Sequence, residues 1–565
     1  MKKASSLYKF IDLSVVFGTS LLFLVFARFD PEPHHDGIQI AAAVGVSEGL
    51  KIHTDVFSQY GPITPWVNGA WLAVTEPTLV SLRYLAAIQL CLIALLMHLI
   101  MFALAVRRPI RLFCTFAWIL TCPVWAYQKW FFSLWPWPSI TYMLTSLGAT
   151  YLLVTPERSK RGQSRKLIFS GFLLGVSILI RPNYGLVYLS SMFMFVLARR
   201  TPRARGDEVR PFVAGLMSAV LITVVGLATK GSIEGWIDQS ILGPIGGNSV
   251  KNPGFAFFYA NYLVGWRRLL ILVGLLAGIV LLFRKVPRFG ALLMVVSGLF
   301  GLDCFTKFDI LIPGTWTFQA LFVDEFMDPL SGMAPIRLGL LASVGVLIWM
   351  TLNLKRFQDE DVDRRPAHRP YHVPAILACA MGGIAQLYPL PDVYHLWWAS
   401  PPILVMCGFY FARADKHWFM AYAMFFIPVL GLIGFRLNEQ LHIPRAAWTG
   451  GILDGMQIDE ELLPSYRAAA TVLERVNRGA SFHCRDGLWA VFQGKYLADS
   501  AAYVEWAFGI DETKELTNTS TVWCLDSGAE VPALDGSYQG VLSSGDEELF
   551  FSRFSGGYMI HVWLK

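Results

Sequence analysis

The stretch that decides the fold lies near the start of the chain. Residues 10–29, FIDLSVVFGTSLLFLVFARF, read as a membrane helix, and residues 30–49, DPEPHHDGIQIAAAVGVSEG, follow at once. This order places five ionisable residues together at the edge of the bilayer: Asp30, Glu32, His34, His35 and Asp36. Ionisable side chains at that depth are costly and usually mark a functional site. The sequence therefore predicts a membrane protein with its chemistry at the end of the first span.

Composition supports a polytopic membrane protein. The chain has 565 residues, of which 55% are hydrophobic and only 16% are charged, whereas soluble domains carry about 25% charged residues. The net charge of +6 does not indicate nucleic-acid binding, because the basic residues lie mostly in short loops between apolar segments. No P-loop, GxGxxG, GxSxG or HExxH motif is present, which disfavours nucleotide-driven chemistry.

Hydropathy predicts about thirteen membrane spans, since one span takes roughly 20 apolar residues. They are 10–29, 80–106, 112–127, 138–155, 167–181, 184–199, 211–229, 267–283, 289–306, 336–353, 373–390, 400–412 and 418–436. Lys and Arg cluster in every second loop, and the positive-inside rule makes those loops cytoplasmic. The N-terminus is then cytoplasmic, and the working face and the C-terminus are extracytoplasmic.

The chain divides into two predicted domains. Residues 1–436 form a polytopic helical membrane domain. Two helices within 30–79 lie along the membrane surface: an amphipathic stretch at 38–50 and a second helix at 57–74. Residues 437–565 form a small α/β extracytoplasmic domain, with a surface helix near 459–479. Strand-like runs follow at 488–492, 520–525, 538–544, 547–554 and 558–565. Cys484 and Cys524 lie in this domain and could pair, because an extracytoplasmic compartment permits disulfides.

Asp36 is the predicted catalytic residue. A carboxylate held over the bilayer edge can act as general base towards a sugar hydroxyl. The alternative is that Asp36 caps the helix that begins near Gly37, a common role for Asp. The crowding of two histidines beside it favours the catalytic interpretation.

An acidic first external loop, two interfacial helices and the Tyr60-Gly61-Pro62 turn resemble the GT-C superfamily. These membrane glycosyltransferases use polyprenyl-phosphate-linked sugars and include bacterial arabinosyl-, mannosyl- and aminoarabinosyl-transferases. The resemblance implies a polyprenyl-phosphate sugar donor, a glycan or lipid acceptor, contact with membrane lipids and a bacterial inner-membrane location. His35 stands where a second acid often occurs in that family, and we expect it, Tyr60 and Asn183 to contact substrate.

Basic residues at the outer ends of spans are the predicted phosphate ligands. Negative charge builds on the bridging oxygen as a lipid phosphate leaves, and cations there stabilise it. Arg181 is the strongest candidate, since the resemblance implies a basic residue next to proline at this corner. Lys307 and Arg436 are further candidates. The alternative for each is a snorkelling anchor.

The stretch PLPDVYHLWWASPP, residues 389–402, begins in an outer loop and re-enters the membrane. The resemblance to a Tyr-His element in GT-C enzymes implies that His395 contacts phosphate. Trp397 and Trp398 would stack on sugar, or they form part of an interfacial aromatic belt.

Loop 303–328 carries several carboxylates. Their oxygens could hold a divalent cation such as Mg, Mn or Ca, but their spacing is irregular and a solvated acidic loop is the alternative.

The sequence thus predicts glycosyl transfer from a polyprenyl-phosphate donor on the extracytoplasmic face. Two alternatives remain open. One is a lipid or polysaccharide transporter, and the other is a glycan ligase or polymerase of another membrane fold.

Overall fold

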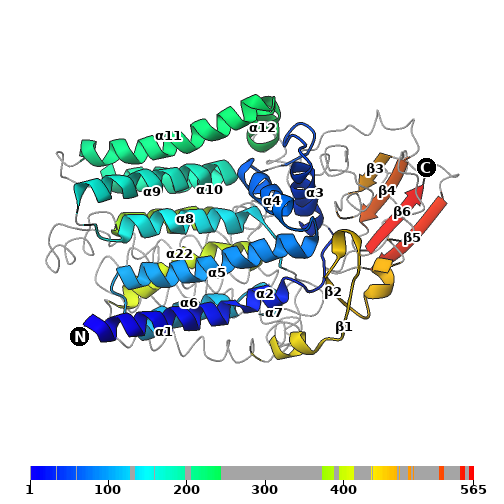
Figure 1. Cartoon of the computed structure of the whole chain (residues 1–565), viewed down its shortest axis with the longest axis horizontal. Coiled ribbons are helices and arrows are strands. Elements are labelled where there is room, and N and C mark those ends of the chain that lie inside the picture. Colours follow the sequence, from blue (N-terminus) through cyan, green and yellow to red (C-terminus); the bar gives the residue numbers. More distant parts are fainter. Residues whose placement is uncertain are drawn as a thin grey trace, which may run out of the picture.

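Figure 1 shows the computed structural model of the chain. The structure describes residues 2–126, 134–197, 205–242, 372–386 and 393–412, apart from positions 34, 59 and 158. Towards the C-terminus it describes 434, 437–467, 470, 481–484, 488, 521–526, 547–553 and 559–564.

Most of the described chain is a bundle of helices that run side by side (Figure 1). They are α1 (Lys2–Ser20), α2 (Leu22–Phe26), α5 (Leu79–Ala103), α6 (Arg108–Leu120), α7 (Pro123–Ala126), α8 (Pro138–Val154), α9 (Lys160–Ile180), α10 (Pro182–Leu197), α11 (Arg205–Thr229), α21 (His372–Ala385) and α22 (Val393–Phe411). Within the described residues, three helices are long and apolar enough to cross a membrane: Leu79–Ala103, Lys160–Ile180 and Val209–Thr229. The mostly helical architecture is therefore confirmed, and these three helices have the length and composition of membrane spans. The predicted spans 267–283, 289–306, 336–353 and most of 418–436 lie outside the described residues.

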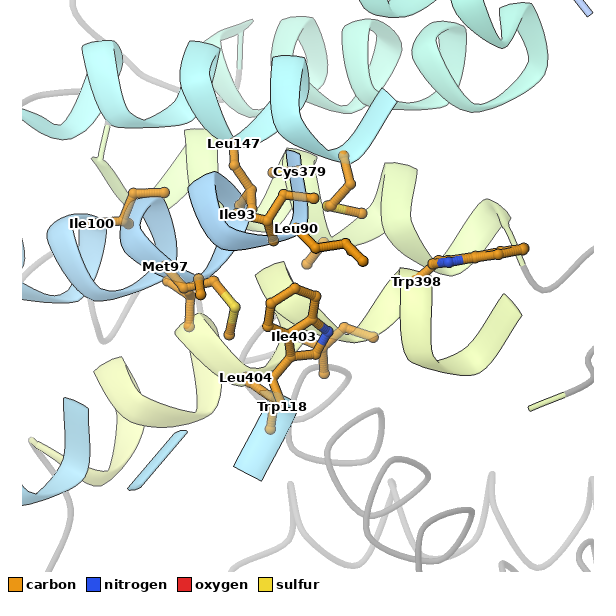
Figure 2. Close-up of a cluster of buried hydrophobic side chains, with 14 of the residues drawn as sticks. Leu90, Ile93, Met97, Ile100, Trp118, Leu147, Cys379, Trp398, Ile403 and Leu404 are labelled. Carbon is orange, nitrogen blue, oxygen red and sulfur yellow. The ribbon is translucent and has the colours of Figure 1, made fainter. Parts of the chain in front are cut away.

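Apolar side chains from several helices form the core of the bundle. Figure 2 shows Leu90 and Met97 of α5 beside Trp118 of α6 and Ile403 of α22, with Leu147 of α8 above them. Between membrane helices, such packing rests on van der Waals contact rather than on exclusion of water.

Helices α9 and α11 come unusually close. A Cβ atom at Gly171 would overlap the carbonyl oxygen of Phe212, and one at Gly215 would overlap that of Ile168. Small residues on both helices therefore allow the backbones to touch, as is common in membrane bundles.

The two ends of the bundle differ. The N-terminus lies at one end, and α3 (His35–Ser47), α4 (Ile63–Val74) and the strands lie at the other (Figure 1). The orientation of the two ends relative to a membrane stays a prediction.

The two helices expected within 30–79 are present, but their character differs from the prediction. Helix α3 is buried continuously from Asp36 to Gly45, so it is enclosed rather than amphipathic. Helix α4 begins at Ile63 rather than near residue 57. Gly61 explains the late start, because its backbone N–H donates to the carbonyl oxygen of Ile180 at 3.1 Å and ties the turn to the end of α9.

Strands follow at the end of the chain. β1 (Arg445–Ala447) pairs with β2 (Gln457–Asp459) in an antiparallel ladder. A second sheet has the order β3 (Ser481–Cys484), β4 (Thr521–Asp526), β6 (Met559–Leu564) and β5 (Glu547–Arg553), with only β3 and β4 parallel. The strand-like runs at 520–525, 547–554 and 558–565 correspond to β4, β5 and β6, whereas β3 was not predicted. The domain boundary at 437 stays a prediction.

Cys484 and Cys524 are paired positions in the β3–β4 ladder. The register is compatible with the suggestion from the sequence that these two residues could pair, which stays a prediction.

Candidate functional site

Aromatic rings gather where α3, the segment before α8 and the start of α22 meet. We call His35, Tyr60, Trp135, Trp137, Tyr394 and Trp398 the aromatic cluster. The ring of His35 stacks on Trp135 with centroids 3.8 Å apart and planes 10° apart. Trp135 stacks in turn on Tyr394 at 4.0 Å. His35, Trp135 and Tyr394 thus form a stack of three rings that come from three separate segments of the chain.

Trp137 joins the rest of the aromatic cluster. Its ring meets the edge or face of His35 at 5.2 Å and of Tyr60 at 5.5 Å, and it lies parallel to Trp398 at 6.2 Å. His395 makes an edge contact with Trp398 at 5.3 Å. The structure therefore brings His35, Tyr60 and His395 to the same group of rings, and the substrate and phosphate contacts predicted for them stay predictions.

Two indole N–H groups in the aromatic cluster have no hydrogen-bond acceptor among the described residues. The Nε1 atoms of Trp135 and Trp137 are buried and bond to none of the described residues. A buried Trp N–H usually finds an acceptor. The cluster therefore combines flat faces with two hydrogen-bond donors, a combination suited to a ligand that carries hydroxyls on an apolar ring.

Arg181 borders the aromatic cluster through Tyr60. Its side chain is buried, with 6% of the residue exposed. The guanidinium lies 4.4 Å from the ring centroid of Tyr60 and 4.3 Å from that of Tyr184. It donates to Ser139 Oγ at 3.0 Å and to the Tyr184 hydroxyl at 2.6 Å. Across the part of the chain that the structure describes, no carboxylate pairs with it.

A buried guanidinium held only by neutral groups is unusual, because a buried charge is normally paired. Arg offers a planar fork of donors that matches phosphate oxygens. Arg181 is therefore the group at this end of the bundle that is best suited to an anionic ligand.

Asp36 has a different environment. Its residue is fully buried, and its carboxylate pairs with Arg83 through both oxygens, Oδ1 with Nε at 3.1 Å and Oδ2 with Nη2. The backbone N–H of Glu32 donates to Oδ2 at 2.7 Å. Burial raises the pKa of Asp36, and the charge of Arg83 opposes that rise.

These contacts bear on the role predicted for Asp36. A general base must reach the proton that it removes, and here the carboxylate is enclosed and bonded to Arg83. Asp36 would need to leave that pair to act, so its assignment as base stays a prediction. Asp36 stands in the first turn of α3, where an acid also favours the helix dipole.

Glu32 was not selected from the sequence as a site residue. Its Oε2 accepts the backbone N–H of His35 at 2.6 Å and lies 2.9 Å from Nδ1 of the same residue. One carboxylate oxygen therefore both caps the start of α3 and fixes the imidazole.

Residues after 440 hold the first external loop in place. Asp30 accepts Arg445 Nε at 2.9 Å and the backbone N–H of Asp459 at 2.8 Å. Its own backbone N–H donates to Gln457 at 2.9 Å, and the Tyr466 hydroxyl donates to the carbonyl oxygen of Pro31 at 2.5 Å. Burial raises the pKa of Asp30, and Arg445 opposes the rise.

A second contact fixes residues 51–60 of the same loop. His53 Nδ1 lies 3.1 Å from Oε1 of Gln239, in the π-helix η1 (Asp238–Leu242) that follows α12 (Ile233–Ile237). The same oxygen accepts the backbone N–H of Ser58 at 3.2 Å. Burial lowers the pKa of His53 from 6.5 to about 4.

Not every predicted residue joins the site. Trp397 stacks on Trp118 at 5.0 Å inside the bundle and donates to its carbonyl oxygen at 2.9 Å, so its neighbour Trp398 is the one in the aromatic cluster. Asn183 is exposed on α10. Helix α22 begins at Val393, so residues 393–399 are helical rather than part of an outer loop.

Lys307, Arg436 and the acidic loop 303–328 lie outside the described residues. In the part that is described, no group of three or more His, Cys, Asp and Glu residues could hold a metal ion. The divalent cation expected from loop 303–328 is therefore untested.

The sequence held one signal for the missed tryptophans. Trp135 and Trp137 alternate with prolines in the run LWPWPS, residues 134–139. Proline restricts the residue before it to extended backbone, which predicts a rigid segment just before α8.

No protein-family model matches the chain, and no curated protein matches it in sequence. Among solved structures, ArnT from Cupriavidus metallidurans in the apo state is 14% identical over 99% of this chain and 98% of its own, with a TM-score of 0.39. The same protein bound to undecaprenyl phosphate is 13% identical over 98% of each chain, with a TM-score of 0.41.

The Archaeoglobus fulgidus oligosaccharyltransferase in its apo form gives a TM-score of 0.50. It is 11% identical, over 92% of this chain and 69% of its own. At this identity the likeness concerns the fold alone. The chain therefore shares its overall fold with this oligosaccharyltransferase, and the likeness agrees with the resemblance drawn from the first loop of the sequence.

Proposed function

We propose that the protein is a membrane glycosyltransferase. It moves a sugar from a polyprenyl-phosphate donor to a hydroxyl of a glycan or lipid acceptor on the extracytoplasmic face. The observation that carries the proposal is Arg181, a buried cation with no carboxylate partner among the described residues. The fold, which an oligosaccharyltransferase shares, supports it.

In this proposal Arg181 binds the donor phosphate. Bond breaking leaves a second negative charge on that phosphate, and a guanidinium already in place stabilises it without reorganisation. Tyr60 and Tyr184 hold the guanidinium between their rings. The aromatic cluster beside it offers ring faces and the two indole N–H groups to the sugar.

Purified protein tests the proposal with a panel of radiolabelled polyprenyl-phosphate sugars and a lipid or glycan acceptor. We expect wild-type protein to form a labelled product with at least one donor. Loss of one transition-state donor typically costs a factor of about 10²–10³ in rate, so Arg181→Met should reduce transfer by about that factor. Arg181→Lys should recover part of the rate, because it keeps the charge but loses the fork.

Arg108→Ala is the matched control, since Arg108 pairs with Asp12, away from the aromatic cluster. It should transfer sugar at the wild-type rate. Labelled lipid that crosses the bilayer unchanged, with no sugar transferred by wild-type protein, would instead support the transporter. Arg181→Met with wild-type kinetics would contradict the phosphate site.

The predicted role of Asp36 has its own test. If Asp36 is the base, Asp36→Asn abolishes transfer in protein that still folds. Transfer at the wild-type rate would rule that role out.

A further inference from the structure

We propose that His35, oriented by Glu32, takes the proton from the acceptor hydroxyl. The inference rests on the proposed glycosyl transfer and assigns its general base to a residue that the sequence analysis treats only as a substrate contact.

The first step is the orientation of the imidazole. Glu32 Oε2 lies 2.9 Å from His35 Nδ1, and the same oxygen accepts the His35 backbone N–H at 2.6 Å. The carboxylate therefore holds the proton on Nδ1, which makes Nε2 the basic nitrogen of the neutral ring. Stacking on Trp135, with planes 10° apart, fixes the ring plane.

The second step is access. Among the described acid–base side chains near the start of α3, Asp36 is 0% exposed and Glu32 is 2% exposed, whereas His35 is 24% exposed. Part of the His35 side chain can therefore be reached from solvent, whereas the carboxylates of Asp36 and Glu32 are enclosed.

The third step is position relative to the phosphate site. Trp137 contacts His35 at 5.2 Å and Tyr60 at 5.5 Å, and Tyr60 covers Arg181. His35 and Arg181 are thus connected through the rings of Trp137 and Tyr60. We infer that the sugar lies against these rings, with the acceptor hydroxyl at His35 and the leaving phosphate at Arg181.

The fourth step is the charge around the imidazole. Glu32 contacts the imidazole with its carboxylate, which stabilises the imidazolium. The nearby Asp36 is matched by Arg83 of α5, and the rings of Trp135, Trp137 and Tyr394 add no charge. Arg181 lies beyond Tyr60.

The reaction balances as a single displacement. The acceptor hydroxyl passes its proton to Nε2 of His35 while its oxygen bonds to the anomeric carbon. The bond from that carbon to the phosphate oxygen breaks, and the electron pair leaves with the polyprenyl phosphate, beside Arg181. The imidazolium then returns its proton to water.

The experiment measures the pH dependence of kcat/KM for His35→Gln, Glu32→Gln and Asp36→Asn. General-base catalysis typically contributes a factor of about 10²–10⁴, so His35→Gln should lose about that factor without a matching rise in the donor KM, and its acidic limb should disappear. Glu32→Gln should move the acidic limb to lower pH, because the imidazolium loses its counter-charge. His442→Gln, at an exposed histidine, is the control and should behave as wild type.

A chemical readout accompanies the kinetics. Diethyl pyrocarbonate modifies neutral imidazole, and peptide mass spectrometry reports the rate at His35. The onset of modification should shift to lower pH in Glu32→Gln than in wild type.

The outcomes separate the two proposals. Wild-type protein that transfers no sugar from any donor overturns the proposed function and this inference with it. Wild-type protein that transfers sugar, with His35→Gln equally fast or Glu32→Gln unchanged in both pH profiles, overturns the inference alone. Loss of transfer in Asp36→Asn with full rate in His35→Gln returns the base to Asp36.

Discussion

Buried charges at the two ends of the helix bundle are arranged differently. At the N-terminal end, the carboxylate of Asp12 in α1 forms ion pairs with Arg108 Nε at 2.7 Å and Arg111 Nη2 at 3.0 Å. His98 Nε2 lies 3.8 Å from the same carboxylate. At the opposite end, Asp36 pairs with Arg83, whereas Arg181 contacts only hydroxyls and rings among the described residues.

The difference separates structural charges from a binding charge. An arginine that is matched by a carboxylate has its charge satisfied and joins elements of the fold. Arg181 keeps its charge uncompensated among the described residues, which costs stability unless a ligand supplies the anion. The comparison therefore predicts a large loss of stability when Arg83 is removed and a small change when Arg181 is removed.

Arg83→Met should give the largest loss of stability. It leaves the Asp36 carboxylate buried without its cation, and breaking a buried pair in this way costs about 3–5 kcal/mol. The thermal unfolding midpoint in detergent measures it. The double variant Arg83→Met/Asp36→Leu should recover most of the loss, and a single variant as stable as wild type would show that the pair contributes little.

Acid should lower the stability of the loop between α3 and α4 through protonation of His53. Its pKa falls from 6.5 to about 4 on folding, so the folded state favours the neutral ring. The free energy of unfolding should therefore be unaffected by His53 above pH 6.5 and should decrease as the pH falls towards 4. One pKa unit corresponds to about 1.4 kcal/mol, so the total decrease is about 3 kcal/mol. Unfolding midpoints at pH 7.5 and 4.5 should differ less in His53→Gln, and an equal difference would place the acid sensitivity elsewhere.

Arg181→Met should change stability by only about 1 kcal/mol. Two hydrogen bonds to neutral groups are lost, at about 0.5–1.5 kcal/mol each, but the cost of an uncompensated buried charge is removed. The same unfolding assay as for Arg83→Met makes the contrast direct. A loss as large as that of Arg83→Met would mean that Arg181 is mainly a structural residue.

Arg108→Ala should have the smallest effect. Its side chain is 45% exposed, and Arg111 still neutralises Asp12. Exposed ion pairs contribute about 0.2–1 kcal/mol, so the midpoint should barely move. A shift as large as that of Arg83→Met would show that Asp12 needs both cations.

Much of the fold could be predicted because bilayer thickness leaves a clear pattern in the sequence. The spans expected at 138–155 and 211–229 lie within α8 and α11 or coincide with them. The exact ends of the helices were predicted less well, because tertiary contacts determine where a helix begins. The start of α4 depends on the approach of Gly61 to α9, which hydropathy does not encode.

The site was predicted in composition but not in pairing. Arg181 was selected as a basic residue next to proline at the end of a span, and His35 and Tyr60 through the resemblance of the first loop; the structure places all three in or beside the aromatic cluster. The pairing of Arg83 with Asp36 was missed, because a pairing across 47 positions depends on how α3 meets α5. Glu32 is only three positions from His35, but its contact with the imidazole was not predicted. Asp12 was overlooked within a span treated as apolar.

The contacts of Asp30 have a consequence for biosynthesis. The first external loop leaves the ribosome early, yet Asp30 is held by Arg445, Gln457 and Asp459, which are made more than 400 residues later. The loop that carries Glu32, His35 and Asp36 can therefore reach this geometry only after the chain beyond residue 440 has been delivered to the same side of the membrane. A chain that ended before residue 440 would insert its helices, but it would lack the residues that hold this loop in place.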